Sequence, residues 1–200
     1  MTKTLEFIFD FGSPNAYLSY RVIPGILERT GAELKIIPCL LGGIFKATNN
    51  QSPMMAFGVV KGKLEYETLE SKRFVTKHGL ARYHFNPHFP VNTLLLMRGL
   101  IFAEREGFAD RYVEVGLAAM WEDGEKMDDP EVFVRVMDAA GLDGNAIMEG
   151  VLEPEVKAGL IANTEAAVAR GVFGIPTFFV GKEMFFGKER LGQVEEELMA

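Results

Sequence analysis

Hydrophobic positions follow strand-like patterns near both ends of the chain and helical spacing in its middle. Residues 4–11 (TLEFIFDF) are rich in aromatic and β-branched side chains, which predicts a buried strand. Ser13 and Pro14 then form a strong helix start, and Gly31 marks the end of that helix. Residues 33–38 (ELKIIP) alternate and predict a second strand. This order predicts a right-handed βαβ unit with two parallel strands.

The middle of the chain is predicted to be helical. Residues 40–64 are rich in glycines and amides and contain Pro53, so they predict a loop with one short helix. Each later segment begins at an N-cap or a proline, or ends at a glycine. The predicted helices cover residues 65–78, 92–106, 108–121, 130–141, 144–151 and 154–171.

The end of the chain returns to strands. Residues 176–180 (PTFFV) and 183–186 (EMFF) flank a Gly-Lys turn and predict a β-hairpin. Gly187 then leads into a closing helix that runs to about Met199. Strands at both ends with helices between them predict an α/β protein.

The element order is that of a thioredoxin-like domain, βαβ … αββα, with a large all-helical insertion. We expect residues 1–40 and 165–200 to form the thioredoxin-like domain. We expect residues 41–164 to form the insertion, including its connecting loop.

Composition and charge narrow the function classes. The 200 residues are 48% hydrophobic, which is enough for a substantial core, and no apolar run reaches the roughly 18 residues of a membrane helix. The N-terminus has no secretion-signal pattern, so we expect a cytoplasmic protein. A net charge of −7 argues against nucleic-acid binding. Residues 1–100 nevertheless carry net +5, which leaves anionic small molecules as candidate partners.

Cys39 is the only cysteine. A single cysteine excludes an internal disulfide, a CxxC redox pair and a cysteine-based zinc cluster. Because Cys39 ends a predicted buried strand, we expect it to act as a small apolar residue. His84 and His88 have helical metal-ligand spacing, but Pro87 interrupts a helix there, so we expect no metal site.

Ser13 is the first candidate site residue. It lies where a predicted strand ends and a predicted helix begins, at the edge of an α/β sheet where ligands bind. A helix N-terminus offers free amide donors and about half a positive charge, and therefore favours an anion. The alternative is that Ser13 only caps its helix.

Two further candidate motifs lie near the C-terminus. Pro176 opens a predicted strand directly after Ile175, and base rates favour a trans bond there, because only about 5–6% of such bonds are cis. The segment FFGKERL presents Lys188, Glu189 and Arg190 at another helix start. The alternatives are an ordinary strand-opening proline and a solvated first turn.

The last candidates lie in the predicted loop and beside it. Lys46, Asn49 and Asn50 could line a polar site, or the loop could simply link the domains. Trp121, the only tryptophan, either packs in the core or lines an aromatic pocket.

Taken together, these motifs carry a family resemblance. FDFGSPNAY, LGGIFKATNN, HFNPHFPVNTLLLMRG, FGIPTFFV and FGKERL occur in this order. The chain resembles the 2-hydroxychromene-2-carboxylate isomerases over residues 5–198. These are a DsbA-like family akin to kappa-class glutathione transferases, and the HFNPHFPVNTLLLMRG segment favours the isomerase branch.

The resemblance implies a homodimer that uses glutathione and a small aromatic carboxylate. It places Ser13 beside the glutathione sulfur and makes the bond before Pro176 cis. Glu189 stands where the family usually has aspartate. The implied glutathione-binding residues are Asn50, Ile175, Pro176, Lys188, Glu189 and Arg190, and the implied substrate-binding residues are Lys46, Tyr83 and Trp121.

The chemistry expected from the resemblance is isomerisation through transient addition of the glutathione thiolate. The redox position of a thioredoxin-like fold holds a CxxC motif, and here Ser13 and Pro14 begin that segment instead. Disulfide exchange therefore has no thiol in that place. The alternatives are a kappa-class-like transferase and a non-catalytic glutathione-binding protein.

Overall fold

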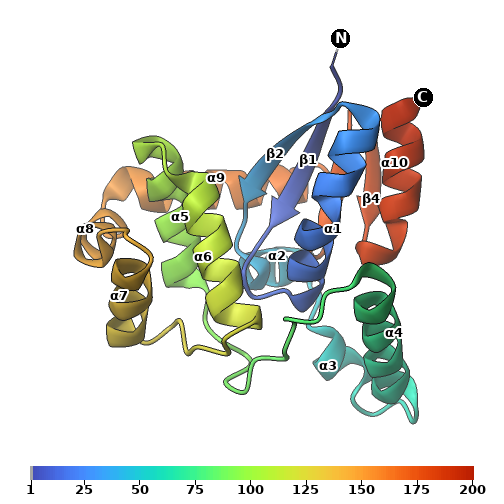
Figure 1. Ribbon diagram of the computed structural model, residues 1–200, viewed down its shortest axis with the longest axis horizontal. Coiled ribbons are helices and arrows are strands. Elements are labelled where there is room, and N and C mark those ends of the chain that lie inside the picture. The colour runs from blue at the N-terminus through green and yellow to red at the C-terminus, as the bar shows by residue number, and fades with distance from the viewer. Residues whose placement is uncertain (1) are drawn as a thin grey trace.

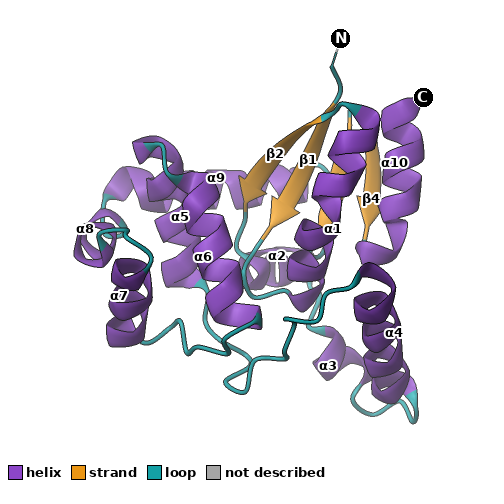
Figure 2. Cartoon of the chain, viewed as in Figure 1, coloured by secondary structure: helices purple, strands orange, loops and turns teal. Residues whose placement is uncertain are grey.

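The computed structural model describes residues 2–200 and centres on one four-stranded mixed sheet. The strands are β1 (Thr4–Phe9), β2 (Glu33–Pro38), β3 (Thr177–Val180) and β4 (Glu183–Phe186). Their order in the sheet is β2-β1-β3-β4. β1 and β2 are parallel, whereas β3 is antiparallel to both β1 and β4. Figure 2 shows this sheet enclosed by helices.

Helices make up most of the remaining chain. Their bounds are α1 (Pro14–Thr30), α2 (Leu41–Thr48), α3 (Pro53–Phe57), α4 (Lys63–His78), α5 (Leu94–Glu106), α6 (Ala109–Trp121), α7 (Pro130–Ala139), α8 (Gly144–Gly150), α9 (Pro154–Ala169) and α10 (Leu191–Met199), with a 3₁₀ turn η1 (Lys188–Arg190) before α10. No helix within residues 2–200 is long and apolar enough to cross a membrane.

The helices form two groups around the sheet. In Figure 1, α5 to α8 gather on one side of the sheet, while α3 and α4 lie on the other side, below α10. α9 joins the first group to the sheet, because it contacts α5, α2 and β2. The expected boundary at residue 164 falls inside this continuous helix.

The sheet and the helical group share one hydrophobic core. Phe7, Phe9 and Phe178 are fully buried in the sheet, and Phe11 continues this core toward α6. A Cβ atom at Gly116 of α6 would lie only 2.6 Å from the Phe11 ring, so a glycine lets the helix approach closely. This packing ties α6 to the turn that precedes α1.

The predicted fold class is confirmed: β1-α1-β2 and β3-β4-α10 form a thioredoxin-like domain, and helices occupy the chain between them. α1 begins and ends as expected, with Ser13 as its N-cap and Gly31 in the left-handed region at φ 68°. The hairpin and its Gly181 turn are also confirmed.

Some predicted boundaries were wrong. Residues 40–64 hold two short helices rather than one, because Pro53 starts a new helix capped by Ser52. β1 ends at Phe9, since the next residue, Asp10, turns its carboxylate to backbone N–H groups outside the sheet. The closing helix is divided into η1 and α10.

Candidate active site

Ser13 lies between the start of α1 and the segment that enters β3. Its Oγ accepts a hydrogen bond from the backbone N–H of Ala16 at 3.2 Å, so it does cap the helix. The same hydroxyl donates to the carbonyl oxygen of Ile175 at 3.0 Å. The side chain is buried, and it joins two segments that are 162 positions apart in the sequence. A cap alone does not require this second bond.

The Ile175–Pro176 peptide bond is cis. The base rate pointed to trans and was wrong here, whereas the family resemblance implied the observed isomer. Both residues are buried, and the N–H of Ile175 donates to no group within residues 2–200. A second cis bond, Phe89–Pro90, was not expected.

Asn50 is brought to the same place by a side-chain bond. It follows α2, and its Nδ2 donates to the carbonyl oxygen of Phe173 at 2.8 Å. Phe173 is two residues before Ile175, so the amide supports the segment that faces Ser13. Asn49, at the C-cap of α2, adopts a positive φ of 53° that turns the chain toward this contact.

The turn η1 is attached to the same segment. The N–H of Gly187 donates to the carbonyl oxygen of Pro176 at 2.9 Å. The Lys188 side chain is only 2% exposed and forms an ion pair with Glu189. Its Nζ also lies 5.5 Å from the centre of the Phe74 ring of α4. The alternative of a solvated first turn is therefore wrong for Lys188, which is buried, whereas Glu189 and Arg190 are exposed.

The three predicted substrate-binding residues occupy different environments. Lys46 is exposed in the last turn of α2, and no ion pair to it occurs within residues 2–200. Tyr83 is half-buried, and its ring stacks on Tyr17 of α1 with centroids 5.6 Å apart. Burial, together with the nearby Tyr17, raises the pKa of Tyr83 to about 12.

Trp121 packs in the core. Its ring is fully buried, and its Nε1 donates to the carbonyl oxygen of Phe11 at 2.8 Å. It lies behind Tyr83, with ring centroids 6.3 Å apart. The indole has no exposed surface in this structure, because neighbouring side chains cover it.

Asp10 is a residue that the sequence reasoning missed. Its buried carboxylate accepts hydrogen bonds from the N–H groups of Gly12 at 2.8 Å and Leu41 at 2.7 Å. It thereby joins the Ser13 turn to the start of α2, the helix that carries Lys46. Burial raises the pKa of Asp10. A carboxylate between Phe9 and Phe11 in the predicted strand was the available signal.

The arrangement is suited to an anion. The first turn of α1 contains no acidic residue, and the amide donors of a helix start lie beside the Ser13 hydroxyl. Within residues 2–200, no group of three or more histidine, cysteine or acidic side chains could hold a metal ion.

Comparison with known proteins agrees with this architecture. The family model of the DSBA-like thioredoxin domain matches residues 4–199. The 2-hydroxychromene-2-carboxylate isomerase of Sphingobium xenophagum is 28% identical over 201 residues and is covered completely, as is this chain. The glutathione S-transferase kappa 1 of Rattus norvegicus is 25% identical, with 94% of this chain and 88% of that protein covered.

Solved structures give the same relationship. A 2-hydroxychromene-2-carboxylate isomerase has a TM-score of 0.82 at 27% identity, covering 96% of this chain and 93% of that one. A probable DsbA oxidoreductase from Streptomyces coelicolor has a TM-score of 0.73 at 18% identity, covering 98% of this chain and 89% of that one. The second likeness concerns the fold alone.

Proposed function

The chain belongs to the family of DsbA-like thioredoxin domains, and from this premise we propose that it is a glutathione-dependent isomerase. The reaction would interconvert 2-hydroxychromene-2-carboxylate and trans-o-hydroxybenzylidenepyruvate. Full-length relatives with the isomerase name support the reaction class. The main observation behind the proposal is that the start of α1 has no cysteine. Ser13 lies there instead, beside free amide donors and facing Ile175, so the site suits a thiolate brought by a ligand.

The groups around Ser13 fit a cysteine-containing peptide. The free N–H and the carbonyl oxygen of Ile175 can pair with one peptide unit, as neighbouring strands do. Asn50 and the turn at Lys188, Glu189 and Arg190 lie beside this segment and offer polar contacts to the ends of the peptide. Glu189 is one methylene longer than the aspartate usual in the family, so its carboxylate reaches farther from the backbone.

Ser13 has the chemistry to stabilise a thiolate. Lowering a thiol pKa from about 8.5 to 6.5 requires about 2.7 kcal/mol in favour of the anion. A helix terminus contributes about 0.3–1 kcal/mol, up to about 2 when partly buried, and a hydrogen bond to a charged group about 1.5–3 kcal/mol. The two together are sufficient. The Ser13 hydroxyl can rotate from Ile175 to donate to sulfur.

Glutathione, when bound, would supply a thiolate that adds to the conjugated double bond of the ring-opened substrate; the bond would become a single bond that can rotate, and elimination of the thiolate would restore the double bond. In this scheme Ser13 donates a hydrogen bond and is not a nucleophile. Lys46 would bind the substrate carboxylate, because it is exposed at the end of α2 and has no ion pair within the described residues 2–200. Tyr83 would form a wall of the substrate pocket, supported from behind by Trp121.

A kappa-class-like transferase is the second candidate, favoured by the similarity to kappa 1 enzymes. It would use the same thiolate but release a stable conjugate. A third candidate binds glutathione without catalysis. We further propose a homodimer, as in the resembling family. A disulfide exchange activity is disfavoured, because the only thiol, Cys39, is buried.

The test is turnover of 2-hydroxychromene-2-carboxylate by the purified protein with and without glutathione. We expect turnover only with glutathione, with the glutathione recovered unchanged. A stable conjugate would instead identify a transferase. Binding of glutathione without any product would identify a non-catalytic binding protein, and turnover unchanged without glutathione would refute the mechanism.

A further inference from the structure

The segment between α4 and α5, residues 79–93, is fixed to the C-terminus of α6; we call it the strap. The backbone N–H of His84 donates to the carbonyl oxygen of Trp121 at 2.7 Å. The buried Asn86 side chain donates to the carbonyl oxygens of Met120 and Glu125, each at 2.9 Å. The bonds to Met120 and Trp121 satisfy carbonyl groups that the end of α6 leaves free. The strap is therefore held in place on both sides of Phe85.

Phe85 is exposed although its backbone is fixed. Phe85 is 55% exposed, whereas the neighbouring Trp121 is fully buried. The Phe85 ring lies 5.0 Å from the ring centre of Phe89 and 6.0 Å from that of Trp121. An exposed aromatic ring that is supported from behind loses little conformational freedom when a flat ligand stacks on it.

This aromatic cluster adjoins the turn that holds Ser13. Trp121, which supports Phe85, donates its N–H to the carbonyl oxygen of Phe11, two residues before Ser13. Tyr83, from the same strap, stacks on Tyr17, one helical turn after Ser13. The strap thus contacts α1 directly through Tyr83, and it contacts the turn before Ser13 only by way of Trp121 of α6.

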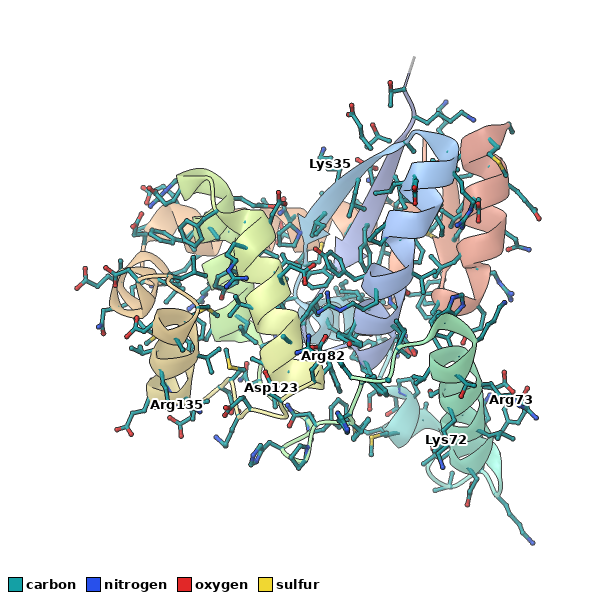
Figure 3. The ribbon with its side chains drawn as sticks, viewed as in Figure 1. Lys35, Lys72, Arg73, Arg82, Asp123 and Arg135 are labelled. Atoms are coloured by element: carbon teal, nitrogen blue, oxygen red, sulfur yellow. The ribbon has the colours of Figure 1, made fainter. Side chains whose placement is uncertain are left out.

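The charge of the strap matches an anionic ligand. Residues 79–93 contain Arg82 and two histidines but no acidic residue. Arg82 contacts Glu122 at 2.7 Å, and its side chain remains 76% exposed. Figure 3 shows it at the lower end of α6, near Asp123. An exposed aromatic ring and an exposed guanidinium in one segment suit a ligand that combines a ring with a carboxylate.

We propose that Phe85 is a specificity-determining residue: the ring of an aromatic carboxylate substrate stacks on its exposed face. Asn86 acts through Phe85 as a positioning residue, because it fixes the backbone next to the ring. This inference rests on the proposed isomerase function and extends it, since Phe85 takes the direct ring contact that Trp121, being buried, does not make.

The test compares wild type with Phe85→Leu and Phe85→Tyr in the presence of saturating glutathione. The readouts are kcat and KM for hydroxybenzylidenepyruvate, and the calorimetric Kd of trans-cinnamate, an unreactive aromatic carboxylate. We expect Phe85→Leu to raise KM and Kd about three- to tenfold, because stacking is lost. The value of kcat and the Kd of glutathione stay within twofold, and Phe85→Tyr matches wild type.

Tyr66→Leu is the matched control. Tyr66 of α4 is exposed to a similar extent, 52%, and lies outside the strap. A change in Kd below twofold for Phe85→Leu, or an equal change for Tyr66→Leu, would overturn the inference. So would failure of wild type to bind cinnamate. Absence of turnover in wild type would refute the proposed function instead, and the cinnamate affinities would then decide the role of Phe85.

Discussion

Ser13 and Cys39 lie near each other in the fold but in opposite environments. Both follow parallel strands, and the N–H of Cys39 donates to the carbonyl oxygen of Phe9, the last residue of β1. Ser13 faces the amide donors at the start of α1. The Cys39 thiol is fully buried, and burial, with a smaller contribution from Asp10, raises its pKa to about 12.

The difference shows what a reactive sulfur requires. A thiolate accepts hydrogen bonds, so it is stabilised where N–H and O–H groups point toward it. The hydrogen-bond partner of Cys39 is the carbonyl oxygen of Asn163, with sulfur and oxygen 3.5 Å apart, which favours the protonated thiol. The chain's own sulfur is therefore unsuited to nucleophilic chemistry, and a sulfur brought to Ser13 would be suited to it.

The largest predicted effect concerns thiol reactivity. In the double variant S13C/C39A the only thiol lies at the helix start, whereas in wild type it is Cys39. At pH 8 we expect the variant thiol to react with an aromatic disulfide reagent at least about a thousandfold faster than native Cys39. Unfolded wild type is the control and should react as an ordinary thiol. If the folded variant and folded wild type reacted at rates within tenfold of each other, the two positions would not differ as proposed.

The second prediction tests whether Ser13 is more than a cap. Ser13→Ala should lower kcat/KM about ten- to a hundredfold, because a hydrogen bond to a charged sulfur is lost, and should lower stability by about 1 kcal/mol. The pKa of the bound glutathione thiol, followed by its absorbance at 240 nm, should rise.

Asp143→Ala provides the matched control for this loss of a cap. Asp143 caps α8 by accepting from the N–H of Ala146 at 2.9 Å, within the helical group. It should lower stability by a similar amount while activity is kept. Equal activity in both variants would assign Ser13 a capping role only.

The last prediction concerns the free energy of unfolding at alkaline pH. Because the folded pKa of Cys39 is raised to about 12 from an ordinary 9.0, the stability that the neutral thiol provides is complete below pH 9. It is lost as the pH rises from about 9 to 12, at about 1.4 kcal/mol per pH unit. The free energy of unfolding, measured with denaturant at several pH values, should fall less steeply above pH 9 for Cys39→Ala than for wild type. If the stabilities of the two proteins fell equally with pH, the assigned pKa of Cys39 would be contradicted.

Features that depend on neighbouring residues were predicted, whereas features that depend on distant residues were missed. Ser13, Pro14 and Gly31 specify the bounds of α1 through capping and φ preferences that act within a few residues, so α1 was predicted correctly. The hairpin around Gly181 is local in the same way. The start of α2 at Leu41 was missed because its N–H bonds the carboxylate of Asp10, which lies far away in sequence.

Three features could be predicted from local signals in the chain: the thioredoxin-like order of elements, the start of α1 at Ser13, and the lack of a thiol at that start. These follow from local periodicity, capping and the position of one cysteine. Three other features were visible only in the folded protein: the bond from Ser13 to Ile175, the burial of Trp121 beside an exposed Phe85, and the carbonyl oxygen that faces Cys39. Each of these features depends on contacts between segments that are distant in the sequence, and a local pattern of residues does not predict such contacts.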